Sequence, residues 1–583
     1  MRMRGVVLAL GLIGGMALPA AGQQASDTVA PEAPTAIAGK AVVEAKRHMV
    51  VAANPLAAQA GLDVLRKGGS AADAMIAVQA TLGLVEPQSS GLGGGAFLVW
   101  YDAASGALTT IDGRETAPAA ATPELFLGSD GKPLEFFDAV VGGRSVGVPG
   151  VPRLMDAAHG RWGKLPWADL LAPTAAMARD GFKVSPRLAT LVAEDAELLG
   201  KEPTTRDYFF PGGTAIKEGD TLKNAAYAAT LDMLAAKGVE AFYSGEIAQA
   251  IVAAVNGHAG NPGKLSADDL AGYKTVERPA VCAPYRGHQV CGMGPPSSGA
   301  TAIGQILGMV EPFDIGTLGP DDPQSWRIIG DATRLAFADR ERYLADPDFV
   351  SIPKGLLNRD YLAARSALLR RDTALGKDDV KAGEPPWDKA ELRRDALALD
   401  MPSTTHFVIV DDAGNILSMT SSIENGFGAR LMTNGFLLNN QLTDFAFEPT
   451  DEGVTVANRV EPKKRPRSSM SPTIVLKDGK PVYALGSPGG SSIIPYVAQA
   501  LIALVDWKMD MQQAIGMPHR VNRFGTYDLE EGTDAVELKA DLEALGFKTA
   551  VKEHNSGLHG IAIMPDGLQG GADPRREGVA VGD

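Results

Sequence analysis

The chain has 583 residues, of which 45% are hydrophobic and 21% are charged, a composition that is ordinary for a soluble globular protein but too long for one small core. Its formal net charge of −15 gives it no general attraction for nucleic acid or for anionic lipid, so no nucleic-acid partner is expected. The eight histidines are scattered, and the sequence contains neither HExxH nor CxxC, so we expect no metal site and assign no cofactor.

The N-terminus has the pattern of a secretory signal. Two arginines precede an apolar run over residues 6–18, and small residues follow that run. This order predicts a signal peptide over residues 1–22 and a protein that is periplasmic or secreted. The apolar run is too short and too rich in glycine for a stable membrane span, and an uncleaved anchor is the alternative. Residues 23–40 are rich in Ala, Pro, Thr and Ser and predict a flexible leader.

Two helices are expected next. Asn54 can cap the first, Pro55 suits its first turn, and a glycine pair ends it. Ser70 and Asp73 form a capping-box pattern before the second, which is apolar almost all round and is therefore expected to be buried. A glycine-rich segment then leads into the apolar strand AFLVWY, and a second strand-like segment ends at Arg114.

Residues 143–147, GRSVG, match the G-x-S-x-G nucleophile elbow of serine hydrolases. The elbow requires a helix that begins directly after the serine. Prolines at positions 149 and 152 favour a turn there, so we interpret the match as accidental. The remainder of the middle region, roughly residues 150–400, is typical of helices with short connections.

Cys282 and Cys291 are the only cysteines of the chain. If Arg286-Gly287 is a two-residue hairpin turn, the two cysteines face each other across the ladder, within disulfide reach. Export favours a disulfide between them. Two buried free thiols are the alternative, and the sequence does not decide between the two.

Residues 402–415, PSTTHFVIVDDAGN, place Thr404 directly before an apolar strand. The simplest interpretation is that threonine favours strands. A second interpretation is catalytic, since a threonine that begins a chain can use its own α-amine, with a pKa of about 7.7–8.0, as a general base. Thr404 is internal, so the bond after Ser403 would first have to be broken, and the Thr404 hydroxyl can do this itself. The strands that follow indicate an α+β or layered α/β protein.

The segments STTHFVIVDDAGN, FLLNNQLTDF, KRPRSSMSPTIV and GSPGGSS closely resemble the γ-glutamyltransferases. Upstream, NPLAAQAGLDVLRKGGSAADAMIAVQA, SGLGGGAFLV, DGRETAPA and YRGHQVCGMGPPSSGA fit as well, so the resemblance spans about residues 40–580. These are N-terminal-nucleophile hydrolases that cleave themselves into two subunits. The resemblance implies an αββα four-layer sandwich of the α/β (α+β) class, with a large subunit of residues 41–403 and a small subunit of residues 404–583. The two subunits would form a heterodimer around one intertwined catalytic domain.

The matched motifs also imply the catalytic residues. Thr404 corresponds to the nucleophile, Ser422 to a hydroxyl that supports it, and cleavage would fall between Ser403 and Thr404. Gly489 and Gly490 resemble the oxyanion hole, where a backbone N–H donor is worth about 3–4 kcal/mol. Without the surrounding match, these glycines would be interpreted as a plain turn before a helix.

The substrate-binding residues follow from the chemistry of a γ-glutamyl group, which ends in one carboxylate and one ammonium. Arg114 corresponds to the carboxylate clamp, a task that suits a planar guanidinium. Many family members have asparagine where this chain has Glu424, and the carboxylate adds an anionic contact for the ammonium. The implied set comprises the donors Arg114, Ser468 and Ser469 and the acceptors Glu424, Gln441 and Asp444.

The resemblance therefore implies an exported enzyme that takes a γ-glutamyl group from glutathione or a related amide. It would form an ester on Thr404 and pass the group to water or to an amino-acid or dipeptide acceptor. A cephalosporin (glutaryl) acylase of the same fold is the alternative, but a glutaryl group lacks the ammonium that the acceptors would bind. An inactive binding protein of this fold is a third reading, which the intact Thr404, Arg114 and Gly489-Gly490 disfavour.

Overall fold

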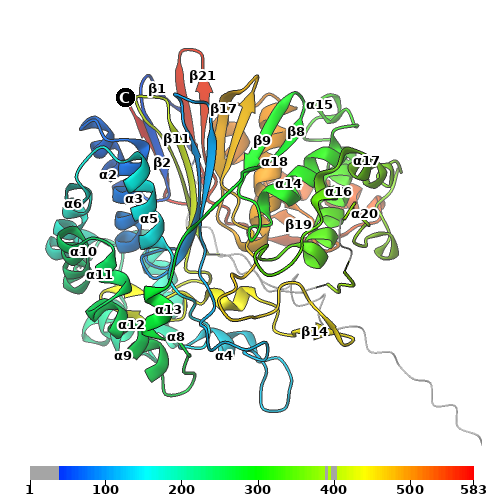
Figure 1. The fold of residues 1–583 in the computed structure, drawn as a ribbon. Helices are drawn as coiled ribbons and strands as arrows, with labels where there is room; N and C mark the ends of the chain where they lie inside the picture. The colour runs from blue at the N-terminus through cyan, green and yellow to red at the C-terminus, as the bar shows by residue number, and fades with distance from the viewer. Residues whose placement is uncertain (1–38, 388–390, 396–402) are drawn as a thin grey trace, which may run out of the picture.

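The computed structural model of the chain describes residues 39–387, 391–395 and 403–583. Two seven-stranded sheets lie face to face in the middle, and helices cover the outer face of each (Figure 1). Every neighbouring pair of strands within these two sheets is antiparallel. This arrangement confirms the expected αββα sandwich. The predicted signal peptide and most of the predicted leader lie outside the described residues.

The first sheet interleaves strands from both ends of the chain. Two strands of the C-terminal third, β10 and β11, occupy its centre, and strands from the N-terminal half flank them. In order across the sheet, the strands are β23 (Val579–Gly582), β2 (Met49–Ala52), β10 (Thr405–Val410), β11 (Ile416–Ser422), β3 (Gly95–Tyr101), β4 (Leu108–Gly113) and β7 (Val276–Arg278).

The second sheet is interleaved in the same way. Its central strands come from the C-terminal third, and both edges come from earlier in the chain. The strands are β1 (Val43–Ala45), β22 (Gly567–Ala572), β21 (His559–Met564), β17 (Lys480–Gly486), β16 (Thr473–Lys477), β9 (His288–Gly292) and β8 (Val281–Tyr285).

Strand β10 shows why its sequence is a continuous apolar run. Successive side chains of a strand point to opposite faces. Val408 packs between the two sheets, in a cluster that includes Ile474 and Ile561 of the second sheet. Phe407 and Ile409 belong to the core beneath the helices of the first layer. Both faces of the strand are therefore buried, which fixes the position of its first residues.

The helices divide between the two outer layers (Figure 1). The two N-terminal helices begin as predicted, because Asn54 Oδ1 accepts a hydrogen bond from the Leu56 amide and Ser70 with Asp73 forms the capping box. The first layer includes α2 (Pro55–Arg66), α3 (Ala71–Val85), α5 (Val151–Trp162), α6 (Trp167–Asp180) and α10 (Ala225–Lys237). The second includes α14 (Gly299–Val310), α16 (Pro323–Tyr343), α17 (Arg359–Ala367) and α18 (Ile493–Val505).

Two local predictions can be compared with the structure. In GRSVG, Ser145 is buried, its hydroxyl donates to the Val140 carbonyl over 2.6 Å, and the next helix begins only at Val151, so there is no nucleophile elbow. In the hairpin of β8 and β9, Cys282 lies opposite Cys291, and a disulfide joins them. Among the described residues, no helix is long and apolar enough to span a membrane.

Candidate active site

Thr404 lies at the entrance of β10, and the register of the sheet determines what it meets. Thr405 pairs with Ser421 across the β10–β11 ladder, so Ser422 lies beside Thr404. The two hydroxyl oxygens are 3.1 Å apart, and both side chains are buried. A nucleophile candidate and a second hydroxyl are thus brought together by strand pairing alone.

The bond between Ser403 and Thr404 is surrounded by hydroxyl groups. The Thr404 hydroxyl donates a hydrogen bond to the Ser403 carbonyl oxygen. Ser422 Oγ lies 3.2 Å from the same carbonyl oxygen and accepts a hydrogen bond from the Glu424 amide over 2.8 Å. Ser403 is itself held by a 3.0 Å hydrogen bond from its hydroxyl to the Gln88 carbonyl. The Thr404 hydroxyl is therefore in direct contact with the carbonyl that it would attack.

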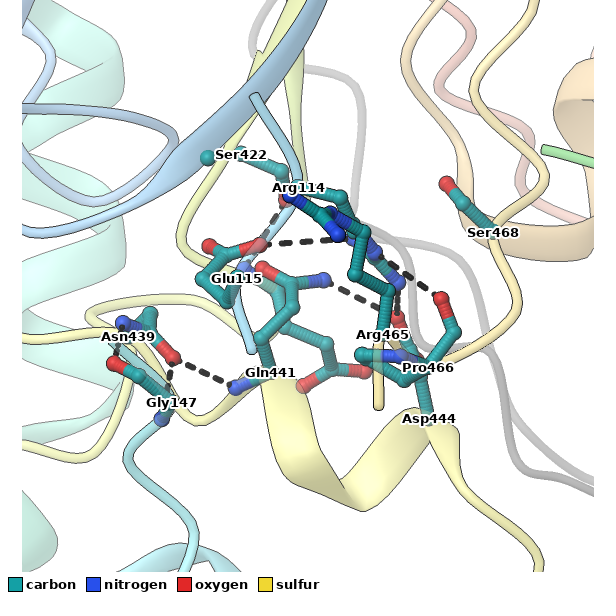
Figure 2. A network of polar contacts seen from close by, with 12 residues as sticks. Arg114, Glu115, Gly147, Ser422, Asn439, Gln441, Asp444, Arg465, Pro466 and Ser468 are labelled. Carbon is teal, nitrogen blue, oxygen red and sulfur yellow. Dashed lines mark hydrogen bonds and ion pairs between the residues drawn. The ribbon is translucent and has the colours of Figure 1, made fainter. Parts of the chain in front are cut away.

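Arg114 follows β4 and is fully buried. Its Nη2 donates to the Asp444 carboxylate and, over 2.9 Å, to the Arg467 carbonyl, while Nε donates to the Pro466 carbonyl over 3.2 Å (Figure 2). Within the described part of the chain, Nη1 has no hydrogen-bond partner. A buried guanidinium with an uncommitted N–H edge is a donor for a carboxylate ligand.

The acceptor residues gather around the same position. Gln441 and Asp444 lie on the short 3₁₀ helix Gln441–Asp444, and Gln441 Nε2 donates to Asp444 Oδ2 over 2.9 Å (Figure 2). Glu424 lies in the turn after β11, with a φ of 78°, and its carboxylate accepts a hydrogen bond from Asn440 Nδ2. Carboxylate and amide oxygens thus converge near Arg114, as a site for an ammonium beside a carboxylate requires.

The remaining predicted residues complete a single cavity. Ser469 Oγ accepts a hydrogen bond from Arg340 Nη2 over 2.8 Å, and Ser468 lies on the segment that follows Pro466. Gly489 and Gly490 have φ values of 131° and 56°, a region that favours glycine, and they lead into α18. Of the predicted catalytic, cleavage and substrate-binding residues, all but Gly489 line this cavity, and Gly489 precedes the lining residue Gly490.

Glu115 is a site residue that the sequence reasoning did not single out. Its side chain is fully buried, and within the described residues neither carboxyl oxygen has a hydrogen-bond partner. Burial raises the pKa of this carboxyl to about 8, although the guanidinium of Arg114, 3.8 Å away, opposes the shift. The motif DGRETAPA offered the signal, because Glu115 directly follows Arg114. Burial thus opposes ionisation of the carboxyl beside Arg114.

Asn440 was also missed, although it lies in the matched segment FLLNNQLTDF. Its Nδ2 donates to the Glu424 carboxylate, and its Oδ1 accepts from the Asn425 amide over 3.0 Å. It thereby fixes the turn that follows β11. The sequence signal that could have identified Asn440 was the consecutive pair Asn439-Asn440 within this matched motif.

The family model described as Gamma-glutamyltranspeptidase matches residues 57–583. The chain belongs to this family. It is 36% identical, over 93% of its length and 92% of the relative's, to a glutathione hydrolase proenzyme of Bacillus subtilis (strain 168). A protein of the same description from Escherichia coli (strain K12) is 37% identical over 91% of each chain. An acylase ACY 1 proenzyme of Pseudomonas sp. (strain SE83) is 34% identical over 92% of this chain and 93% of that protein.

Solved structures agree with this assignment. A cephalosporin acylase from Bacillus halodurans superposes with a TM-score of 0.83, at 28% identity, over 94% of this chain and 97% of that chain. A γ-glutamyltranspeptidase from Helicobacter pylori superposes with a TM-score of 0.55, at 33% identity, over 60% of this chain and 97% of that chain. The expected family, fold and enzyme class are confirmed, and the protein is an enzyme with transferase and hydrolase activity.

Proposed function

We propose that this protein is a glutathione hydrolase and γ-glutamyltransferase whose nucleophile, Thr404, is released by self-cleavage after Ser403. The observation that carries the proposal is the Thr404 hydroxyl, which contacts the Ser403 carbonyl inside the cavity that also holds Arg114 and Asp444. Cleavage would give a large subunit of residues 41–403 and a small subunit of residues 404–583, paired as a heterodimer. Because the central strands of both sheets come from the small subunit and are flanked by strands of the large one, the two would remain associated.

Maturation would proceed through an acyl shift. The Thr404 oxygen attacks the Ser403 carbonyl carbon, the bond from that carbon to the Thr404 nitrogen breaks, and the nitrogen takes up the hydroxyl proton. The result is an ester between Ser403 and the Thr404 oxygen. Water then hydrolyses the ester, leaving a carboxylate on Ser403 and a free hydroxyl and α-amine on Thr404. Ser422, 3.1 Å from the attacking oxygen, is placed to orient it.

The released α-amine supplies the base for turnover. It accepts the Thr404 hydroxyl proton as the oxygen attacks the γ-carbonyl of the donor. The backbone amides of Gly489 and Gly490 would stabilise the oxyanion. The protonated α-amine then gives its proton to the leaving nitrogen, and a γ-glutamyl ester remains on Thr404. Water or the amine of an amino acid or dipeptide resolves this ester, and the threonine oxygen recovers its proton.

The donor's amino-acid head would be bound by charge complementarity. The open Nη1 edge of Arg114, with the hydroxyls of Ser468 and Ser469, suits the carboxylate. The carboxylates of Asp444 and Glu424 suit the ammonium. A glutaryl group lacks the ammonium and would lose the charge-assisted contact proposed here with these buried carboxylates, so it should be discriminated against.

Cephalosporin acylase is the second candidate, and it rests on the structural similarity over 94% of this chain at a TM-score of 0.83. The deciding experiment offers the purified enzyme two matched anilides, one γ-glutamyl and one glutaryl. We expect the enzyme to release the aniline much faster from the γ-glutamyl anilide than from the glutaryl anilide. Asp444→Asn should reduce this difference in rate. Faster release from the glutaryl anilide would contradict the proposal. Export to the periplasm or the medium is part of the proposal and rests on the N-terminal sequence pattern.

A further inference from the structure

The segment between β22 and β23 passes from one sheet to the other beside Thr404. It spans residues 573–578, leaving the second sheet after Ala572 and entering the first at Val579. Within it, Nη1 of Arg576 donates to the Thr404 carbonyl oxygen over 3.1 Å. We call residues 573–578 the crossover loop. Through the hydrogen bond from Arg576, the crossover loop contacts the backbone of Thr404.

Arg576 is held rigidly in this position. Its side chain is 3% exposed, and Nε donates to Asn555 Oδ1 over 2.7 Å. A methyl group added at Gly557 would come within 2.7 Å of Arg576 Cδ, so the guanidinium has little room to move aside. A buried cation fixed on both sides can define the direction of the carbonyl that it binds.

The crossover loop is in turn tied to the other end of the described chain by Lys40. Nζ of Lys40 donates to the carbonyl oxygens of Asp573, Arg576 and Gly578, over 2.7, 2.7 and 2.6 Å. An ammonium has three N–H donors, and all three of these bind carbonyl oxygens of the crossover loop. Burial lowers the pKa of Lys40, while the nearby carboxylates of Asp573 and Glu577 act in the opposite direction.

The contact with the Thr404 carbonyl gains importance when Thr404 becomes a chain terminus. Its amine side is then no longer held by a peptide bond, and strand pairing begins only at Thr405. Terminal residues fray unless they are fastened. The hydrogen bond from Arg576 restrains the peptide plane that follows Thr404, next to the Cα atom that carries the α-amine and the hydroxyl-bearing side chain.

We propose that Lys40 and Arg576 are positioning residues for the nucleophile, acting in series through the crossover loop. Lys40, the last residue of the predicted leader, would thereby remain on the large subunit and set the geometry of the first residue of the small subunit. It follows that processing must leave Lys40 on the mature chain. The inference rests on the proposed role of Thr404.

The test compares Lys40→Met with Lys46→Met as a matched control, since the Lys46 side chain is exposed and its Nζ donates to the Asp566 carbonyl over 2.9 Å. A misplaced reacting group costs up to about 100-fold in rate, so we expect kcat to fall between about 10- and 100-fold in Lys40→Met. The KM for the γ-glutamyl donor should stay unchanged, because Arg114 and Asp444 are not touched. Lys46→Met should change neither parameter, and Lys40→Arg should recover part of kcat.

The double variant Lys40→Met with Arg576→Met provides the second readout. Residues that act through one contact are not additive, so the double variant should lose no more kcat than Arg576→Met alone. Additive losses would overturn the serial arrangement. A kcat for Lys40→Met equal to that of Lys46→Met would overturn the proposal, as would parallel changes in kcat, KM and melting temperature.

Two further measurements keep the outcomes distinct. If Lys40→Met does not accumulate as folded protein, Arg576→Gln carries the same prediction for kcat and KM, because it removes the guanidinium that binds the Thr404 carbonyl and Asn555 while Lys40 stays in place. The mass of the small chain of each variant is also measured. A small chain that does not begin at Thr404 contradicts the proposed function, whereas a small chain that begins at Thr404, together with normal kcat in Lys40→Met, contradicts only the positioning role.

Discussion

The hydroxyl oxygens of Thr404 and Ser422 lie 3.1 Å apart, although Thr404 directly precedes β10, Ser422 ends β11 and a hairpin separates them. The same Ser422 oxygen is 3.2 Å from the Ser403 carbonyl and accepts a hydrogen bond from the Glu424 amide. Ser422 is therefore held by the turn after β11 and contacts both the Thr404 hydroxyl oxygen and the Ser403 carbonyl oxygen. This arrangement requires an antiparallel register and cannot be produced by sequence proximity alone.

Ser422→Ala should slow maturation. Losing one hydrogen bond to the reacting group is worth about 0.5–1.5 kcal/mol, so we expect cleavage to slow by about two- to tenfold. The measurement is the time course of the uncut chain on a denaturing gel after dilution from denaturant. Ser421→Ala is the matched control, because its hydroxyl lies 3.4 Å from the Gly95 carbonyl on the neighbouring strand. Equal rates for the two variants would show that Ser422 has no special role.

Arg114→Ala should weaken donor binding far more than it slows maturation. Loss of a charged hydrogen-bond partner costs about 1.5–3 kcal/mol, which corresponds to a roughly tenfold to 150-fold weaker binding of γ-glutamyl donors. Arg114→Lys should recover little of this, since an ammonium lacks the planar fork. Donor affinity is measured on the cleaved enzyme, with Arg179→Ala, at an exposed pair with Asp232, as the control. Unchanged affinity in Arg114→Ala would remove Arg114 from the site.

Glu115 should make stability fall as pH rises towards 8. Its pKa is raised to about 8 in the folded protein because of burial, whereas a carboxyl in the unfolded chain titrates near the ordinary 4.5. Between these values the folded state binds more protons than the unfolded state, so the free energy of unfolding decreases as pH rises through this window.

The measurement is the free energy of unfolding of the unmodified protein and of Glu115→Gln, at several pH values between 4.5 and 8. The difference between the two proteins should shift steadily in favour of Glu115→Gln as pH rises, because glutamine has no proton to lose. A difference that is constant across this range would show that Glu115 titrates normally. Glu277→Gln, at an exposed pair with Arg161, is the control and should show no such trend.

Much of the fold and site follows from the sequence because local rules and matched motifs agree. The caps at Asn54 and Ser70, the hairpin register of Cys282 with Cys291 and the strand after Thr404 each depend on neighbouring residues. The gathering of the donor and acceptor residues was inferred from resemblance, since nothing in spacing or periodicity brings Arg114 to Asp444.

The residues that the sequence reasoning missed act through tertiary contacts. Glu115 has an ordinary sequence context, and its raised pKa arises from burial that only the folded chain creates. Lys40 and Arg576 lie at opposite ends of the chain, and their shared contact depends on a loop that crosses between sheets. No local pattern encodes such a contact.

The segment 447–467 should leave the acyl-enzyme accessible to water. It contains no aromatic residue after Phe447, which stacks on Phe126 with ring centroids 4.6 Å apart. Its short hairpin, β14 (Thr450–Asp451) with β15 (Val454–Thr455), is mostly exposed and offers little apolar surface with which to seal a pocket. We therefore expect substantial hydrolysis beside transfer when the acyl-enzyme is partitioned between water and a dipeptide acceptor. Near-complete transfer at low acceptor concentration would mean that the site is well shielded.

The most direct test of the whole account is the N-terminal residue of the small chain. The purified protein is separated under denaturing conditions, and the mass and terminal sequence of each chain are determined, beside those of Thr404→Ala. We expect a small chain that begins TTHFVIV, from Thr404, in the unmodified protein and a single uncut polypeptide in Thr404→Ala. If Thr404→Ala still yields a chain with the same terminus, cleavage does not depend on the Thr404 hydroxyl, and the assignment of Thr404 as the self-releasing nucleophile is wrong.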